Sequence, residues 1–197
     1  IPFLHISSDY VFDGSGDSPW RPHDPVRPLS AYGRSKLLGE QLVQESGARA
    51  IIIRTSWVFS AHGSNFVKTM LRLGTERNLL NIVGDQVGGP TSASSIARSV
   101  VALIKALLEG ETGGTFHFSG APDVSWAEFA RAIMSLAGLS CEIKPILTKE
   151  YPTVAPRPLN SRMDGYSLLD AYGILQPAWA MDLESVIIEL KEQSDAT

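Results

Sequence analysis

Two patterns of hydrophobic positions alternate from the start of the chain to Phe118. Short, nearly continuous apolar runs have the length of β-strands, at residues 2–6, 50–54, 79–83 and 115–118. Between them, apolar residues recur every three or four positions, as along one side of a helix, at residues 30–46, 65–76 and 93–108. This alternation predicts the α/β class, as a Rossmann-like doubly wound parallel sheet of which this chain is the C-terminal remainder.

After Phe118 the hydrophobic pattern weakens and proline becomes more frequent. Ser125 and Glu128 form a capping box at the start of a helix that ends near Gly138. The later predicted elements are a strand at 142–146, an extended proline-rich segment at 151–158 and a helix at 182–192 capped by Asp182. We expect a sheet domain at residues 1–78 and about 91–118, and a smaller mixed α/β domain at about 79–90 and 119–197.

Composition and charge exclude several classes of protein. A net charge of −4 gives no reason to expect nucleic acid as a partner. No apolar run approaches the roughly 20 residues that span a bilayer, and no signal peptide is present, so we expect no membrane partner. Cys141 is the only cysteine, which excludes an internal disulfide and fits a cytoplasmic location. The chain opens inside a strand-like run, so we expect it to lack the first part of a longer protein.

Tyr32 and Lys36 lie four residues apart at the start of a predicted helix, which places both side chains on one face. A phenol has an ordinary pKa of about 10 and is a poor acid near neutral pH. A neighbouring ammonium group lowers that pKa, so the pair can exchange a proton with a substrate oxygen. Ser8 follows a predicted strand, at the edge where open α/β sheets bind ligands, and can bond the same oxygen.

This Ser and Tyr-x-x-x-Lys arrangement is similar to the catalytic set of short-chain dehydrogenases. More specifically, the chain resembles the dTDP-4-dehydrorhamnose reductases, an extended short-chain dehydrogenase/reductase family. The resemblance rests on ISSDYVFDG at 6–14, PLSAYGRSKLLGE at 28–40, RTSWV at 54–58, NFVKTM at 65–70, DQVGGPT at 85–91 and RPLNSR at 157–162. These segments occur in order along nearly the whole chain.

The resemblance implies an NADPH-dependent enzyme that reduces the C4 keto group of dTDP-4-dehydro-6-deoxy-L-mannose to dTDP-L-rhamnose. That product belongs to nucleotide-sugar and cell-surface polysaccharide biosynthesis. The sheet domain would bind the cofactor, with NADH as the alternative to NADPH, and the smaller domain would bind the dTDP-sugar. A homodimer is left open.

The resemblance also implies roles for individual residues. Tyr32 would be the general acid that protonates the sugar oxygen, and Lys36 would bind the nicotinamide ribose and tune Tyr32. Ser8, where the family usually has Thr, would polarise the carbonyl. The residues expected to add cofactor contacts are Ser7 and Ser56, and those expected to bind the sugar nucleotide are Asp9, Tyr10, Trp57, Arg157 and Arg162.

Some of these residues keep a second interpretation. Trp57 would pack against the hexose in this family, but an ordinary core tryptophan fits the same pattern. Arg157 and Arg162 suit the two phosphates of a diphosphate, although solvated surface positions are equally consistent with their sequence context. Glu40 lies two helical turns beyond Tyr32, and we expect it to be solvated.

Two departures from the family pattern limit what the chain can do. No Gly-x-x-Gly-x-x-Gly loop occurs in the 197 residues. Without it the cofactor diphosphate loses its main anchor, so we expect this chain alone to bind NADPH poorly and to be inactive. Ser94 stands where some members have a carboxylate that joins a magnesium site, so no metal is predicted.

Two other functions remain as alternatives. One is a non-catalytic regulatory or binding subunit of the same fold, and the segments 54–57 and 160–162 favour the enzyme over it. The other is a sugar-nucleotide epimerase or dehydratase, which would share Tyr32 and Lys36. A dehydratase needs an acidic pair to remove water, whereas Asp9 is followed by Tyr10.

Overall fold

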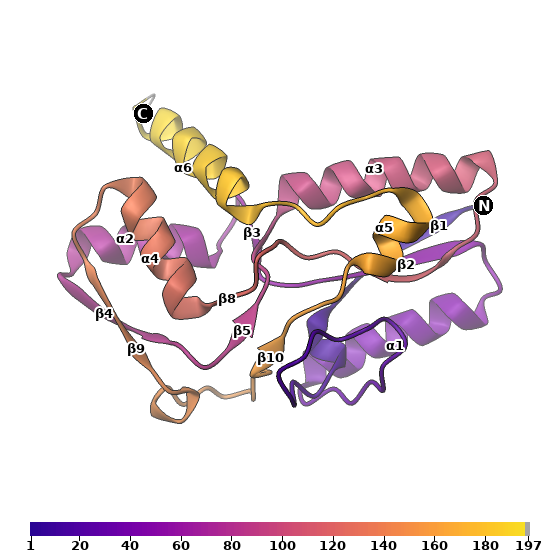
Figure 1. The fold of residues 1–197 in the computed structure, drawn as a ribbon, viewed down its shortest axis with the longest axis horizontal. Coiled ribbons are helices and arrows are strands. Elements are labelled where there is room, and N and C mark those ends of the chain that lie inside the picture. Colours follow the sequence, from indigo (N-terminus) through magenta and orange to yellow (C-terminus); the bar gives the residue numbers. More distant parts are fainter. Residues whose placement is uncertain (196–197) are drawn as a thin grey trace.

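A three-stranded parallel sheet forms the first of two lobes in the computed structural model, which describes residues 1–195 (Figure 1). The strands, in spatial order, are β1 (Phe3–Ser8), β2 (Ala50–Thr55) and β7 (Gly114–His117). Their register places Ser8 beside Thr55, and Arg54 beside His117. The predicted α/β class is confirmed, since each strand pair is joined through a helix and runs parallel.

Helices cover both faces of this sheet (Figure 1). On one face lie α3 (Ala93–Glu109) and the short α5 (Tyr166–Tyr172), and the core between them and the sheet is apolar. Its fully or nearly fully buried members are Ile51, Ile53, Ile96, Leu103, Leu107, Phe118 and Leu168. Because β2 alternates its side chains between faces, Ile51 and Ile53 point to α3 while Ile52 and Arg54 point to the other side.

The opposite face is covered by α1 (Ala31–Glu45) and contains charge. Arg54 forms a two-point ion pair with Glu40, with Nε–Oε1 at 2.9 Å and Nη2–Oε2 at 2.6 Å. Both side chains are at most 5% exposed. The expectation that Glu40 is solvated was therefore wrong, because Arg54 from β2 provides it with a buried partner.

The second lobe has an apolar core of its own. Its elements are α2 (Phe66–Glu76), β4 (Leu79–Val83), α4 (Trp126–Ala137), β9 (Glu142–Ile146) and α6 (Trp179–Asp195). Strands β4 and β9 pair in parallel, and α2 packs against α4 (Figure 1). Val67 and Met70 place α2 in this core, although our expected sheet domain ran to residue 78. The two-domain division itself stays a prediction.

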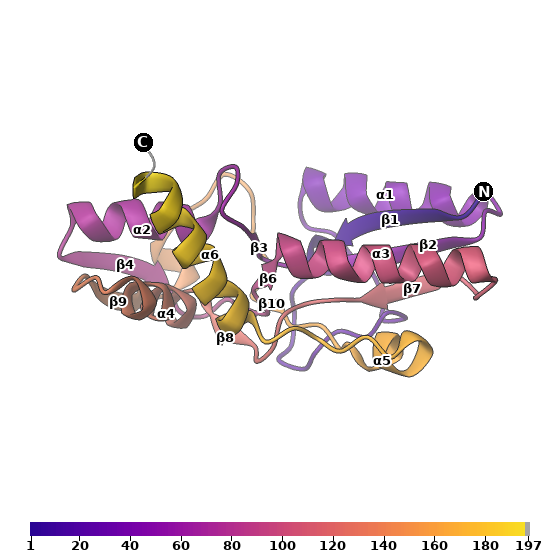
Figure 2. The ribbon, with the colours of Figure 1, turned by 90° about the horizontal axis from the view of Figure 1, so that it is seen from above.

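Short strands connect the two lobes, and sequence periodicity did not predict them. They are β3 (Val58–Phe59), β5 (Val87–Gly88), β6 (Thr91–Ser92), β8 (Val124–Ser125) and β10 (Asn160–Ser161). β3 pairs with β6, and β5 lies between β10 and β8. Two-residue strands have no measurable hydrophobic period, which is why only the structure shows them. Figure 2 shows β3, β6 and β10 between the lobes, beside the start of α3.

The C-terminal helix differs from its expected form. α6 begins at Trp179, three residues before the expected cap at Asp182. Asp182 instead lies in the first turn of α6, where its Oδ2 accepts hydrogen bonds from Ser92 and Ser95 of the α3 start, at 2.6 and 2.5 Å. It thus connects the two helices and does not occupy the cap position of α6. The short helix α5 was not predicted at all.

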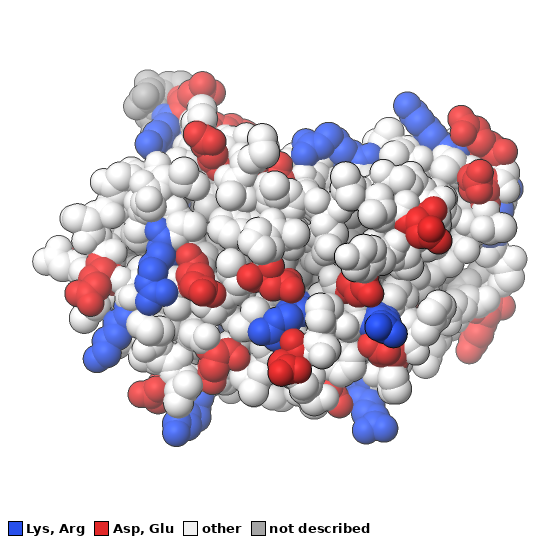
Figure 3. All heavy atoms as spheres, viewed as in Figure 1, with Lys and Arg blue, Asp and Glu red and all other residues white. Residues whose placement is uncertain are grey.

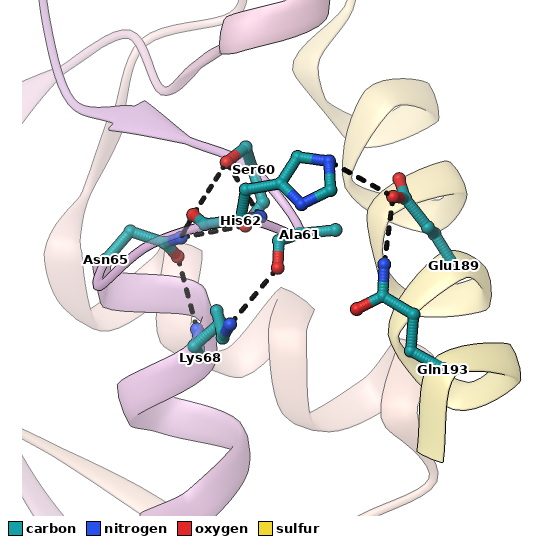
Figure 4. Close-up of polar contacts among 7 residues, drawn as sticks. All are labelled: Ser60, Ala61, His62, Asn65, Lys68, Glu189 and Gln193. Atoms are coloured by element: carbon teal, nitrogen blue, oxygen red, sulfur yellow. Dashed lines mark hydrogen bonds and ion pairs between the residues drawn. The ribbon is translucent and has the colours of Figure 1, made fainter. Parts of the chain in front are cut away.

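A loop before α2 also contacts α6 (Figure 4). His62 Nε2 lies 3.5 Å from Glu189 Oε1, with the histidine side chain 80% exposed. Lys68 donates to the carbonyl oxygen of Ala61 at 3.1 Å, and Asn65 donates to that of Ser60 at 2.7 Å. These contacts shape the loop, but exposed pairs of this kind contribute little stability.

The surface and the helices add two observations. On the face seen in Figure 1, basic and acidic side chains are interspersed over a mostly uncharged surface (Figure 3). Within residues 1–195, none of the helices combines the length and the apolar composition needed to cross a membrane.

Candidate active site

A cavity of about 740 Å³ opens at the carboxyl ends of β1 and β2. Its walls come from those strand ends, the turn η1 (Asp9–Val11), the start of α1 and the segment 153–157. Parallel sheets bind ligands at this edge, because the chain leaves the sheet there and opens a crevice. The expected site residues that line it are Ser7, Ser8, Asp9, Tyr10, Tyr32, Lys36, Ser56, Trp57 and Arg157.

Tyr32 and Lys36 stand together on the first turns of α1 and both line this cavity. The Tyr32 side chain is accessible, with the residue 52% exposed. Lys36 Nζ lies 5.8 Å from the Tyr32 ring centre and donates to the carbonyl oxygen of Ile6 at 3.2 Å. Tyr10 meets the Tyr32 ring edge to face, with centroids 5.6 Å apart. The arrangement keeps an ammonium group and an open phenol at one side of the cavity.

The close approach of α1 to the turn η1 depends on Gly33. A Cβ built at this position would lie 2.1 Å from the carbonyl oxygen of Tyr10, which no side chain could tolerate. Ser30 caps the helix here, since its hydroxyl accepts the Gly33 N–H at 3.1 Å. The local sequence Ser-Ala-Tyr-Gly therefore both starts the helix and lets Tyr32 reach the cavity.

Ser8 and Asp9 are connected to a distant part of the chain. The Ser8 hydroxyl donates to Asp9 Oδ1 at 2.8 Å and accepts the N–H of Tyr10 at 3.2 Å. Ser161, on β10, donates to Asp9 Oδ2 at 2.6 Å. Asp9 is 3% exposed, and this burial raises its pKa to about 6, although the bonds from Ser161 and Ser8 act in the opposite direction.

Buried hydroxyl groups without a partner also face the cavity. Ser7 and Thr55 are 2% and 5% exposed, and neither hydroxyl oxygen has a hydrogen-bond partner among the described residues. Ser56, by contrast, donates to the carbonyl oxygen of Gly89 at 2.9 Å. A buried hydroxyl without a hydrogen-bond partner is unfavourable unless a ligand supplies that partner. Together with Lys36, which lines the same cavity, the Ser7 and Thr55 hydroxyls leave polar groups there that a ligand with hydroxyl or amide groups could bond.

Trp57 is held in an unusual conformation. Its φ of +49° lies in the left-handed region, which is unfavourable for a bulky side chain. Its ring stacks on Trp126 with centroids 3.6 Å apart and planes 9° apart. A Cβ at Gly88 would lie 3.2 Å from the Trp57 ring, so the indole is enclosed from that side as well. Trp57 is thus a cavity wall supported from behind, rather than a fully buried core residue.

The two arginines expected to bind phosphate are separated. Arg157 lines the first cavity and also a second one of about 660 Å³, whose apolar lining includes Phe66, Leu80 and Trp126. Arg162 lines neither of them and donates to the side-chain oxygen of Asn160 at 3.1 Å. Arg157 is therefore placed to contact a ligand that extends between the cavities.

Three residues of this site were not singled out from the sequence. They are Thr55, Ser161 and Trp126. Thr55 and Ser161 lie inside the motifs at 54–58 and 157–162. Their polar side chains next to strand ends could therefore have indicated them from the sequence. Trp126 follows a capping serine and had no local mark of function, because its partner Trp57 is far away in sequence.

Comparisons with known proteins agree with the resemblance. Residues 1–192 match the family described as the RmlD substrate binding domain. The chain is 42% identical over 191 residues to a dTDP-4-dehydrorhamnose reductase of Aggregatibacter actinomycetemcomitans, which covers 93% of this chain and 65% of that protein.

Two solved structures are also similar. The dTDP-4-dehydrorhamnose reductase of Clostridium acetobutylicum superposes with a TM-score of 0.90 at 39% identity, over 95% of this chain and 65% of that one. The enzyme of that name from Bacillus anthracis, solved in complex with NADP, gives 0.87 at 38% identity, over 94% and 65%. The chain thus spans 65% of the length of these relatives.

Proposed function

The chain belongs to the RmlD substrate binding domain family, and from this we propose that its protein is an NADPH-dependent dTDP-4-dehydrorhamnose reductase. It would reduce the C4 keto group of dTDP-4-dehydro-6-deoxy-L-mannose to give dTDP-L-rhamnose. The shared name of the relatives and the NADP complex of one of them support this proposal.

The observation that carries the proposal is the grouping of Tyr32, Lys36 and Ser8 around one cavity at the carboxyl edge of a parallel sheet. A packed Tyr32, or a Lys36 on another face, would have argued against it. The accessible phenol and the nearby ammonium group instead match what proton transfer to a bound keto-sugar requires.

The reaction needs a hydride at C4 and a proton at the C4 oxygen. Bound NADPH would supply the hydride, because no protein side chain can. The Tyr32 hydroxyl would donate the proton, and the positive charge of Lys36 would stabilise the phenolate that remains. Ser8 would bond the same oxygen from the sheet side, and the unpaired hydroxyls of Ser7 and Thr55 would receive the nicotinamide end.

A nucleotide sugar suits the two adjoining cavities. The sugar would occupy the first, beside Trp57, and the nucleotide would extend into the second. Arg157 lines both, so its guanidinium group would meet the diphosphate between them. Arg162 would have to move to contribute. In this scheme the sheet lobe serves the cofactor and the second lobe serves the nucleotide.

Replacing Tyr32 by Phe tests the assignment in the natural full-length protein that contains these residues. The variant should fold normally and reduce the keto-sugar at least about 10²-fold more slowly, because the proton donor is lost. Consumption of NADPH with the dTDP-sugar measures the rate. Tyr166→Phe, a change at an exposed tyrosine of α5, is the matched control and should keep the wild-type rate.

A near-wild-type rate for Tyr32→Phe would refute the general-acid role. The 197 residues alone should bind NADPH weakly in a direct titration, because they contain no glycine-rich phosphate loop. A cytoplasmic location and a homodimer are further parts of the proposal. The single, buried cysteine is consistent with the former.

A further inference from the structure

Ser8, Asp9 and Ser161 form a chain of buried hydrogen bonds at the base of the cavity. The three residues are 6%, 3% and 2% exposed. Ser8 Oγ lies 2.8 Å from Asp9 Oδ1, and Ser161 Oγ lies 2.6 Å from Asp9 Oδ2. Each oxygen of Asp9 thus already accepts a hydrogen bond from a serine.

The hydrogen of the Ser8 hydroxyl is fully committed in this arrangement. A serine hydroxyl has one hydrogen to donate and two positions that accept. An ionised Asp9 can only accept, so it takes the hydrogen of Ser8 and that of Ser161. One accepting position of Ser8 is used by the Tyr10 N–H. What Ser8 can still offer the cavity is a single accepting position.

A neutral Asp9 reverses this polarity. With a proton on Oδ1, Asp9 donates to Ser8, and the Ser8 hydrogen is free to turn toward the cavity. Ser8 then donates to a ligand instead of accepting from it. A keto oxygen can only accept and therefore needs a donor, whereas a sugar hydroxyl can either accept or donate.

We propose that Asp9 is a positioning residue whose protonation state sets the direction of the Ser8 hydroxyl. Neutral Asp9 lets Ser8 donate to the C4 keto oxygen of the substrate, and ionised Asp9 makes Ser8 accept from the C4 hydroxyl of the product. The inference rests on the proposed reductase function. It adds to that function a residue that distinguishes the keto substrate from the hydroxyl product.

Both states of Asp9 are accessible near neutral pH. Burial raises the pKa of Asp9 to about 6, with the Ser161 and Ser8 bonds limiting the rise. The charged and titratable side chains that line the same cavity or follow β10 are Tyr10 on η1, Tyr32 and Lys36 on α1, Arg157 in the 153–157 segment and Arg162 after Ser161. Burial, rather than any of these charges, is the largest cause of the raised pKa.

Binding of the 4-keto sugar nucleotide tests the inference directly, because its C4 oxygen can only accept a hydrogen bond. Calorimetric titration of the full-length protein with NADP⁺ present would measure its affinity from about pH 5 to about pH 8. The wild type should bind the keto-sugar about three- to ten-fold more weakly as pH rises through this range, the worth of one hydrogen bond, whereas dTDP-L-rhamnose, whose C4 hydroxyl can donate or accept, should change little. Asp9→Asn keeps the shape but cannot ionise, so its affinity should not change with pH in this way.

Two further variants sharpen the test. Ser161→Ala removes a bond that favours the ionised form, so the fall in affinity for the keto-sugar should move to higher pH. Asp170→Asn changes an exposed carboxylate on α5 and should reproduce the wild-type profile. A merely structural role for Asp9 would weaken binding equally at every pH.

A second measurement checks the titration of Asp9 without any ligand. A carboxyl with a raised pKa favours the folded state at low pH and loses that contribution as pH rises through its folded pKa. The melting temperature of Asp9→Asn relative to the wild type should therefore increase from about pH 4 to about pH 7. A pH-independent difference would overturn the inference.

The outcomes separate this inference from the proposed function. Keto-sugar binding with the same pH profile in the wild type and Asp9→Asn would overturn the role of Asp9 and leave the reductase proposal intact. Absence of dTDP-L-rhamnose binding at every pH would overturn the reductase proposal. The inference about Ser8, which assumes a dTDP-sugar ligand, would fall with it.

Discussion

The two faces of the first sheet are covered in opposite ways. The α3 face is a continuous apolar core, in which Ile51, Ile53 and Leu103 are fully buried. The α1 face buries Arg54 with Glu40, and beside them the ring of His117. Apolar packing tolerates many exchanges of similar volume, whereas a buried charge requires one particular partner. The α3 face thus supplies general stability, and the α1 face fixes where the helix with Tyr32 and Lys36 lies.

Of the changes that test this comparison, lowering the pH should have the largest effect on the stability of the α1 face. His117 Nδ1 lies 3.0 Å from the carbonyl oxygen of Trp20, and its Nε2 is buried with no partner among the described residues. Burial is the main cause that lowers the pKa of His117 from 6.5 to about 3. As pH falls, the imidazole of His117 takes up a proton in the unfolded chain before it does so in the folded protein. The free energy of unfolding therefore falls as pH drops from 6.5 toward 3, by up to about 5 kcal/mol.

His117→Phe should remove that part of the acid sensitivity. Urea unfolding at several pH values would show a shallower loss of stability below pH 6.5 than in the wild type. His23→Gln, at an exposed histidine, is the control and should follow the wild type. Parallel curves for the wild type and His117→Phe would mean that His117 protonates freely in the folded protein.

Breaking the buried ion pair should have the next largest effect. Glu40→Ala leaves Arg54 buried without its carboxylate, and we expect a loss of about 3 to 5 kcal/mol in the free energy of unfolding. Glu76→Ala removes an exposed pair with Arg72 on α2 and should cost less than about 1 kcal/mol. If both changes cost the same, the buried pair would have no special role.

A cavity in the apolar face should cost slightly less. Leu103→Ala removes a fully buried side chain from α3, and we expect a loss of about 2 to 4 kcal/mol by denaturant unfolding. Val101 lies on the outer side of the same helix and is 55% exposed, so Val101→Ala should change stability by less than about 0.5 kcal/mol. Unlike Glu40→Ala, Leu103→Ala should leave the position of α1, and hence substrate affinity, unchanged.

The same contrast explains what sequence reasoning could predict. The apolar strand 50–54 and the helix at 93–108 follow from periodicity, because burial of one face imposes a repeat on neighbouring residues. Glu40 was misjudged, since its helical position suggested solvent and its partner lies 14 residues away on a strand. Periodicity likewise did not show which core α2 would join, because its amphipathic face fits either, and only the structure places Val67 and Met70 in the second lobe.

The chain alone determined the succession of strands and helices, the capping box at Ser125, and the motifs that indicate the family. Only the tertiary structure decided that Ser161 bonds Asp9 across 152 positions and that Trp126 stacks on Trp57. Local propensities act between residues a few positions apart. Partners of buried polar groups are chosen by three-dimensional packing, because an unpaired polar group inside a protein is costly wherever its partner lies in the sequence.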